Sequence, residues 1–263
     1  MSALAAMFAA RFSVLLQYRA AALAGLGTQI FWGFVRVGIF TAFYRSTDAV
    51  PPMSEADVVT YLWLTQALLL LLPWRYDAEI EAMVKNGAFA YELLRPVDVY
   101  LLWYGRALAQ RTAPALLRCV PMFAIAMPLL GMAPPADLAA ALAFMLSITA
   151  AVLLSSSITA LLSVSLLYTT SGKGVNMLSS SLINVFSGAL VPLALVPGWL
   201  ATIGEVLPFR GLLDTPFRIW LGLLPPSAVA GALVHQLLWT LVLVAIGHFM
   251  LARAATRVTV QGG

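Results

Sequence analysis

Long apolar runs separated by short polar connectors dominate this chain. A helix that crosses a bilayer needs about 20 mostly apolar residues. Six runs meet or approach that length: Ala20–Phe43, Val58–Leu72, Ala107–Leu130, Leu138–Tyr168, Val175–Val196 and Ala228–Leu251. The second run is short and stops at Pro73, and the fourth is the longest. The pattern predicts an all-α integral membrane protein with six transmembrane helices, forming one transmembrane domain over residues 1–263.

The composition strengthens this assignment. Of the 263 residues, 62% are hydrophobic and 10% are charged, whereas a soluble domain carries roughly 25% charged residues. No Asp or Glu falls inside any of the six runs. Carriers driven by protons or cations usually bury carboxylates at mid-membrane to bind the driving ion. If this chain moves a substrate, we therefore expect the energy to come from another subunit.

The basic residues set the predicted orientation. Cytoplasmic loops carry an excess of Lys and Arg. With six spans, one side holds Arg11, Arg19, Arg75, Lys85, Arg95, Arg106, Arg111, Lys173, Arg253 and Arg257. The other side holds Arg45, Arg210 and Arg218 among several acids. Both termini are therefore predicted to be cytoplasmic. The net charge of +4 suits contact with anionic membrane lipids, and no nucleic-acid partner is expected.

The first non-spanning segment is residues 1–19. Its apolar residues recur at helical spacing, with Arg11 and Arg19 close to the polar side; they are Leu4, Met7, Phe8, Phe12 and Leu15. This pattern favours an amphipathic helix lying in the cytoplasmic interface. The alternative is an N-terminal extension of the first span.

The second such segment is the connector over residues 74–96. One face of a predicted helix over Asp77–Leu94 carries Ile80, Met83, Val84, Tyr91 and Leu94, and the other carries Asp77, Glu79, Glu81, Lys85 and Glu92. The helix should end at Arg95, because a residue before proline disfavours helix. Such a helix lies on lipid or docks in a groove of a partner. Lipid-surface helices are usually basic on the polar face, so the acids favour a protein partner.

The third is the outer connector over residues 197–226. Prolines divide it into two predicted short helices, Gly198–Leu207 and Gly211–Leu223, on either side of Pro208. Its large apolar side chains include Trp199, Phe209, Phe217 and Trp220. Exposed to water, these would form a patch that soluble loops avoid. We expect a re-entrant hairpin in the outer leaflet, with these four residues as an outer gate. The alternative is a hairpin lying on the lipid headgroups.

Arg36 is the least expected residue inside a span. A cation there is costly and should face the protein interior or a water-filled path. One interpretation is contact with an anionic group of a substrate or partner along a translocation path. The other is that the side chain extends to the outer interface, because the first span ends near Phe43.

Motifs typical of enzymes are absent or weak. Ser171–Gly174 resembles a phosphate-binding loop only in part, because the earlier glycine and the Ser or Thr after Lys173 are both missing. His235 and His248 lie far apart in the last run, and serine in spans mostly serves helix packing. Lone Cys119 is interpreted as a small packing residue. No catalytic residue, metal site or cofactor is predicted for this chain.

Two local sequences carry a family resemblance. Asn86–Val97 reads NGAFAYELLRPV, and the chain ends with Val260-Gln261-Gly262-Gly263. Together with the order of elements, they resemble one bacterial branch of the type-2 export permeases of ATP-binding-cassette (ABC) transporters. The resemblance implies two permeases, identical or homologous, in the bacterial cytoplasmic (inner) membrane. It also implies two copies of a separate ATPase subunit, which holds ATP and Mg.

The same resemblance assigns roles to residues. It makes the connector over residues 74–96 the coupling helix, with Asp77, Glu79, Glu81, Lys85, Glu92 and Arg95 coupling to the ATPase. The expected function is ATP-driven export of an amphipathic or hydrophobic substrate, such as a drug, an organic cation or a lipid-like molecule. The alternative is a membrane-embedded scaffold or intramembrane enzyme without transport activity.

Overall fold

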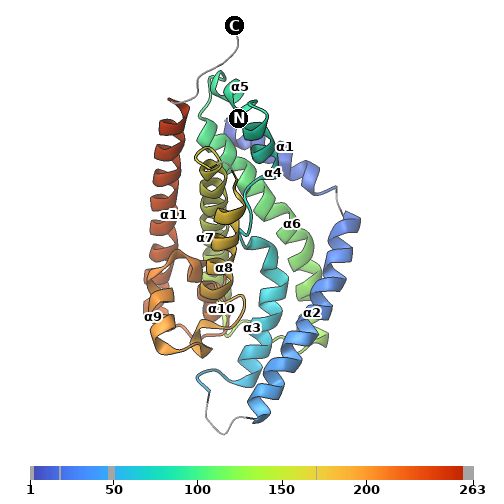
Figure 1. The fold of residues 1–263 in the computed structure, drawn as a ribbon. Helices are drawn as coiled ribbons and strands as arrows, with labels where there is room; N and C mark the ends of the chain where they lie inside the picture. The colour runs from blue at the N-terminus through green and yellow to red at the C-terminus, as the bar shows by residue number, and fades with distance from the viewer. Residues whose placement is uncertain (1–2, 18, 47–50, 170, 257–263) are drawn as a thin grey trace.

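The chain folds into an elongated bundle of helices (Figure 1). The computed structural model describes residues 3–17, 19–46, 51–169 and 171–256. The C-terminal motif Val260–Gly263, the ends Ser2 and Tyr18 of the predicted N-terminal segment, and Asp48 lie outside these ranges. Within them, every regular element is helical. The predicted all-α class is therefore confirmed for the described part of the chain.

Among the described residues, four helices are long and apolar enough to cross a membrane: α2 (Arg19–Ser46), α6 (Val99–Leu129), α7 (Leu138–Ser165) and α11 (Pro226–Ala255). They correspond to the first, third, fourth and sixth predicted spans. α7 packs against both α6 and α11, while α2 packs against α6. These helices supply the long axis of the bundle in Figure 1.

The second and fifth predicted spans are shorter helices. α3 (Glu55–Leu68) continues into the 3₁₀ segment η1 (Leu69–Leu71) and is buried along most of its length. α8 (Lys173–Phe186) ends ten residues before Val196, so the predicted extent of the fifth span is wrong. The chain turns at Gly188, whose φ of 80° favours glycine. It then reaches a second 3₁₀ segment, η2 (Leu193–Leu195).

α6 begins at Val99, earlier than the predicted Ala107. Asp98 caps it, because its side chain accepts a hydrogen bond from the backbone N–H of Leu101 at 2.9 Å. Three prolines, Pro114, Pro121 and Pro128, lie inside this helix without ending it. Spanning helices tolerate proline when neighbouring helices and side chains satisfy the freed backbone groups.

Three short helices gather at one end of the bundle: α1 (Ala3–Leu15), α4 (Ala78–Lys85) and α5 (Phe89–Leu93) (Figure 1). α1 is a helix distinct from α2 and packs against α6. The single helix predicted over Asp77–Leu94 is wrong, because α4 and α5 are separate. The break falls at Gly87, where φ is 75° and a helix cannot continue.

The outer connector forms α9 (Gly198–Val206), the 3₁₀ segment η3 (Pro208–Leu212) and α10 (Asp214–Trp220), toward the opposite end (Figure 1). Two short helices separated near Pro208 are thus confirmed, although α10 is shorter than predicted. α10 packs against α7, and most of its side chains are buried. The α10 part of the connector therefore belongs to the core, whereas α9 has only Gly204 buried.

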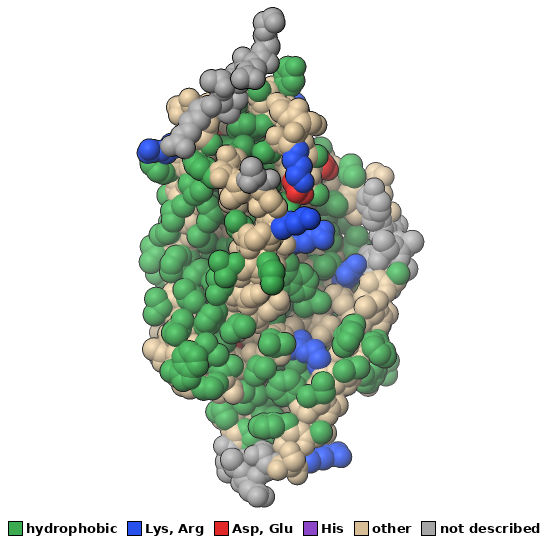
Figure 2. Space-filling view, viewed as in Figure 1, with side chains coloured by type: hydrophobic (Ala, Val, Ile, Leu, Met, Phe, Trp, Pro, Cys, Tyr) green, Lys and Arg blue, Asp and Glu red, His purple; other side chains and the backbone are tan. Residues whose placement is uncertain are grey.

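Two hydrophobic cores hold the bundle together. The larger surrounds α3, where Tyr61, Leu62 and Trp63 are fully buried. The smaller lies beneath α4 and α5, where Ile80 and Phe89 pack with residues of α6, α7 and α11. Hydrophobic side chains also cover much of the outer surface, and acidic ones show only near the end that holds α4 (Figure 2). That distribution fits a bundle whose sides contact lipid or other apolar protein.

Candidate functional site

A network of charged side chains fastens α4 to the long helices. Asp77 caps α4 by accepting from the backbone N–H of Glu79 at 2.8 Å. Its second carboxylate oxygen accepts from Arg106 Nε at 3.2 Å and from Gln110 Nε2 at 2.8 Å, both on α6. The backbone N–H of Asp77 donates to the Ser163 hydroxyl on α7 at 3.1 Å. The start of α4 is therefore anchored to α6 and α7.

Glu79 extends this network to α1. It accepts from Arg106 on α6 at 2.8 Å and from Arg11 Nη1 on α1 at 2.6 Å. The hydrogen bond from Arg11 lowers the pKa of Glu79, and the charge of Arg106 lowers it further, so the carboxylate stays ionised. One carboxylate thus joins three helices, α1, α4 and α6, at this end of the bundle.

The remaining predicted coupling residues fall into two groups. Glu92 is buried and accepts from the indole N–H of Trp103 at 2.6 Å, so it holds α5 against α6. Glu81 accepts from Lys85 at 2.7 Å and from the Tyr76 hydroxyl at 3.1 Å, and the hydrogen bond from Lys85 lowers its pKa. Lys85 and Arg95 are exposed. Only the exposed members are free to meet a partner.

The surface around α5 differs from the sequence-based prediction. Tyr91 and Leu94 were assigned to one apolar face with Ile80. The break at Gly87 separates them: Ile80 is buried, whereas Tyr91 is 72% exposed and Leu94 is 80% exposed. Lys85 and Arg95 are exposed as well, and these four residues at the end of α4 and around α5 are called here the docking face. Large exposed apolar side chains flanked by cations suit a protein contact.

A second polar cluster is buried in the other half of the bundle. The Asp214 carboxylate accepts from the Tyr61 hydroxyl at 3.0 Å and from the backbone N–H of Leu193 at 3.2 Å. The nearest cation is Arg218, with an Nη1 to Oδ2 distance of 3.9 Å. Burial raises the pKa of Asp214. Sequence reasoning missed this burial, because Asp214 sits in a connector and gave no periodic signal.

The turn after α8 completes this cluster. The backbone N–H of Asp214 donates to the carbonyl of Ser187 at 3.0 Å. Arg36 of α2 donates to the carbonyls of Ala189 and Leu190, the latter at 2.9 Å. A Cβ at Gly188 would overlap the Tyr61 hydroxyl. Arg36 therefore contacts backbone of the protein itself, and the turn is held from α2, α3 and α10 at once.

The four residues predicted as an outer gate do not form one cluster. The Phe217 ring packs edge-on against Tyr61, with centroids 5.0 Å apart. Trp220 packs edge-on against Phe144, with centroids 4.8 Å apart. Phe209 is partly buried and Trp199 is exposed. Two of the four thus belong to the core, and a gating role for the set stays a prediction.

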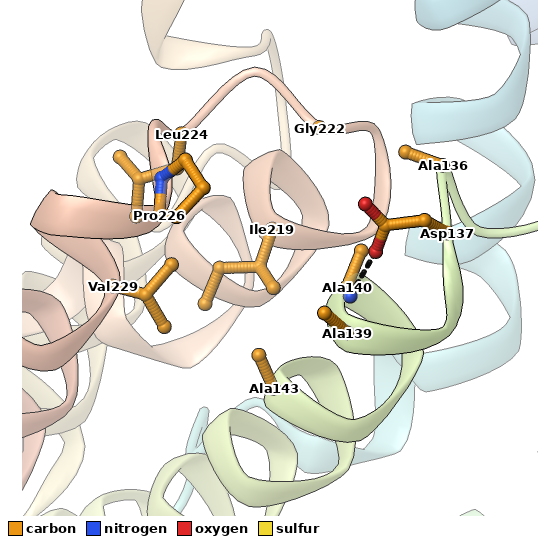
Figure 3. A pocket seen from close by; sticks show the side chains of 10 residues that line it. All are labelled: Ala136, Asp137, Ala139, Ala140, Ala143, Ile219, Gly222, Leu224, Pro226 and Val229. Carbon is orange, nitrogen blue, oxygen red and sulfur yellow. Dashed lines mark hydrogen bonds between the residues drawn. The ribbon is translucent and has the colours of Figure 1, made fainter.

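One hollow near the outer connector lacks the features of a ligand site. Figure 3 shows it between α7, α10 and α11, with walls supplied mostly by alanine and aliphatic side chains. Its one carboxylate, Asp137, accepts from the backbone N–H of Ala140 at 2.6 Å and so caps α7. No polar group lining this hollow is buried without a partner among the described residues. We assign it no ligand.

Comparison with known proteins adds the family. A family model described as "ABC-2 family transporter protein" matches residues 31–262. No curated protein and no solved structure matches the chain. The match begins within α2 and includes every later helix, so it covers the α4–α5 end and the buried Asp214 cluster alike. The resemblance inferred from the sequence is confirmed: this chain belongs to the ABC-2 family of transporter proteins, as a multi-pass transport permease.

Proposed function

We propose that this chain is the transmembrane subunit of an ATP-driven ABC exporter. The family match over residues 31–262 carries the proposal. The substrate is amphipathic or hydrophobic, such as a drug, an organic cation or a lipid-like molecule, and leaves the cytoplasm or the inner leaflet. A permease of this kind has no ATPase activity of its own, so ATP and Mg belong to a partner.

The proposed partner is a separate ABC ATPase in two copies, bound to two permeases. It contacts the docking face on α5 and at the end of α4. Asp77 and Glu79 then act within the permease, because they link α4 to α1 and α6. A displacement of α4 would move α6, a helix of 31 residues, as a rigid body. ATP-driven motion at one end would thereby reach the other half of the bundle.

The second permease, identical or homologous, has a proposed place on α2. This helix presents the large apolar side chains Phe31, Phe34, Ile39 and Phe43 outside the bundle. Lipid or a second permease covers such a surface. In this arrangement both termini lie in the cytoplasm, and the protein resides in the bacterial inner membrane.

Copurification tests the proposal. The permease, expressed with a candidate ABC ATPase from the same genome, should copurify with that ATPase and support ATP hydrolysis only in the complex. Replacing Tyr91 and Leu94 together by Ala should reduce the copurified ATPase. The matched control replaces Leu238 and Leu241 by Ala, because these α11 side chains are also apolar and exposed. Equal recovery of the ATPase with both double variants would show that the docking face does not bind the ATPase.

A further inference from the structure

A pocket of about 440 Å³ lies between α2, the end of α3 with η1, and α6. That volume lies within the roughly 300–1,000 Å³ typical of small-molecule sites. Its lining combines cations, amides and an aromatic ring, and includes Gly25, Gln29, Trp32, Arg36, Gln66, Leu69 and Arg118. No carboxylate of a described residue lines it, so neither arginine in the wall is neutralised there.

The α2 side of the pocket is one continuous face. Gly25, Gln29, Trp32 and Arg36 follow each other at spacings of three or four residues, which places them above one another on a helix. Arg36 lies eleven positions after Gly25, a rise of about 16 Å along the helix axis. The pocket is therefore elongated along the bundle, with Arg36 toward one end and Gly25 toward the other.

Gln29 is the clearest sign that this pocket takes a ligand. Its side chain is 4% exposed, and neither Nε2 nor Oε1 has a hydrogen-bond partner among the described residues. An amide buried without partners is unfavourable, and such groups call for a specific explanation. A polar ligand group in the pocket would supply the missing donor and acceptor.

The two arginines define the charge of that group. Arg36 uses one terminal nitrogen for the Ala189 and Leu190 carbonyls. Arg118 makes no hydrogen bond or ion pair with a side chain of any other described residue, and its guanidinium lies against the Gly25 backbone. A cation inside a membrane bundle should face a partner or a substrate path. Guanidinium groups match the paired oxygens of carboxylate and phosphate.

We propose that this pocket binds the acidic head of an amphipathic substrate. Arg36 and Arg118 contact the anionic oxygens, Gln29 and Gln66 hydrogen-bond the head, and Trp32 with Leu69 packs against the apolar part. This assignment rests on the proposed transport function and narrows its substrate class. It excludes organic cations from this pocket, because two arginines with no carboxylate beside them in the lining would repel them.

Equilibrium binding of matched probes tests the assignment. The full permease–ATPase complex in a neutral detergent is titrated with radiolabelled dodecyl phosphate, and separately with dodecyltrimethylammonium, which has the same chain and opposite charge. Dodecyl phosphate should bind at least roughly tenfold more tightly. Arg118→Gln should remove most of that preference, while Arg118→Lys retains part of it. Equal binding of the two probes, or unchanged binding by Arg118→Gln, contradicts the assignment.

Two matched controls separate the pocket from general effects of charge and helix packing. Arg45→Gln removes an exposed cation from the same helix outside the pocket and should leave binding unchanged. Gly25→Ala places a Cβ against the Arg118 guanidinium and should weaken binding, whereas a Cβ at Gly27 meets no atom within 4 Å. Gly27→Ala should therefore bind normally. Arg36→Gln should also weaken binding. This variant is a less specific test, because it removes the hydrogen bond from Arg36 to the Ala189 carbonyl as well.

The outcomes distinguish this inference from the proposed function. A complex that hydrolyses ATP but does not prefer the anionic probe contradicts the pocket and leaves the exporter role intact. A permease that binds dodecyl phosphate but never associates with an ATPase contradicts the exporter role and supports the pocket. Displacement of the probe by phosphatidylglycerol would identify a membrane lipid as the occupant; no displacement would identify another acidic amphiphile. Both results support recognition of an acidic head.

Discussion

The hydroxyl of Tyr61 donates a hydrogen bond to the carboxylate of Asp214 across 3.0 Å, although the two residues lie 153 positions apart in the chain. Both side chains are buried, and the Phe217 ring packs edge-on against the Tyr61 ring. This contact joins α3 to the outer connector. It helps to hold α10 within the bundle, where most of the α10 side chains are buried.

We predict that Tyr61→Phe destabilises the protein by about 1–3 kcal/mol, because a buried acceptor loses its donor. The measurement is the thermal unfolding midpoint of the purified permease in detergent. Tyr91→Phe is the matched control, because Tyr91 is exposed, and its midpoint should not change. If Tyr61→Phe unfolds at the wild-type temperature, the hydrogen bond does not support the fold.

The pH dependence of stability should report on Asp214. Burial raises the pKa of this carboxyl in the folded protein above its ordinary value of 3.8. The folded state then binds more protons than the unfolded state between the two pKa values, so stability falls as pH rises through that window. Arg218, Arg210 and Tyr61 face the carboxyl and limit the shift.

Asp214→Asn removes this titration. Its unfolding midpoint, measured relative to wild type, should therefore rise as the pH increases above 3.8, the ordinary pKa of an aspartate. A constant difference between the two proteins over that range would show that Asp214 does not titrate with a raised pKa. A fall in the relative unfolding midpoint of Asp214→Asn would show that the pKa of Asp214 is lowered in the folded protein. The charge of Arg218 acting alone would have that effect.

Gly188 should tolerate no side chain. Its φ of 80° is unfavourable for other residues, and a Cβ would overlap the Tyr61 hydroxyl. Gly188→Ala should therefore reduce folded protein severely, by more than the about 1 kcal/mol typical of point substitutions. Gly198→Ala is the control, because a Cβ there meets no atom within 4 Å. The yield of monodisperse protein on size-exclusion chromatography distinguishes the two; equal yields would contradict the tight contact.

Hydrophobic periodicity predicted the long helices because each is bounded by residues with local signals. α11 begins at Pro226, next to Pro225, and α7 begins after Asp137, which caps it. The extents of α8 and of the helix beginning near Asp77 were wrong for one reason. Gly188 and Gly87 adopt positive φ, but a glycine inside an apolar or amphipathic run does not by itself announce a break.

The contacts of the charged residues were harder to predict, because they join side chains far apart in the sequence. The sequence placed Asp77, Glu79 and Glu92 on the charged face of one predicted helix, but Asp77 and Glu92 are buried while Glu79 is exposed. In the folded chain, Arg106 and Trp103 of α6 reach them, which local spacing cannot reveal. Replacing Glu79 by Lys would consequently break contacts inside the permease as well as any contact with an ATPase. The exposed residues of the docking face give a cleaner test of coupling.

Whether the outer connector enters the lipid can be tested at α9. Trp199, Ile203 and Val206 share one exposed apolar face of this helix, and Ile203 is 44% exposed. In a Cys119→Ala background, Ile203→Cys should react slowly with a bulky charged thiol reagent added outside. It should react readily with a small membrane-permeant maleimide. A helix face turned toward lipid is closed to the charged reagent, which stays in water, but open to the permeant one.

Two further cysteines calibrate this measurement. Glu205→Cys, at an exposed polar position of the same helix, should react quickly with both reagents. Leu213→Cys should react with neither, because Leu213 is fully buried in the bundle. Rapid labelling of Ile203→Cys by the charged reagent, at the rate of Glu205→Cys, would show that α9 lies in water. The re-entrant hairpin would then be wrong, while the buried position of α10 would stand.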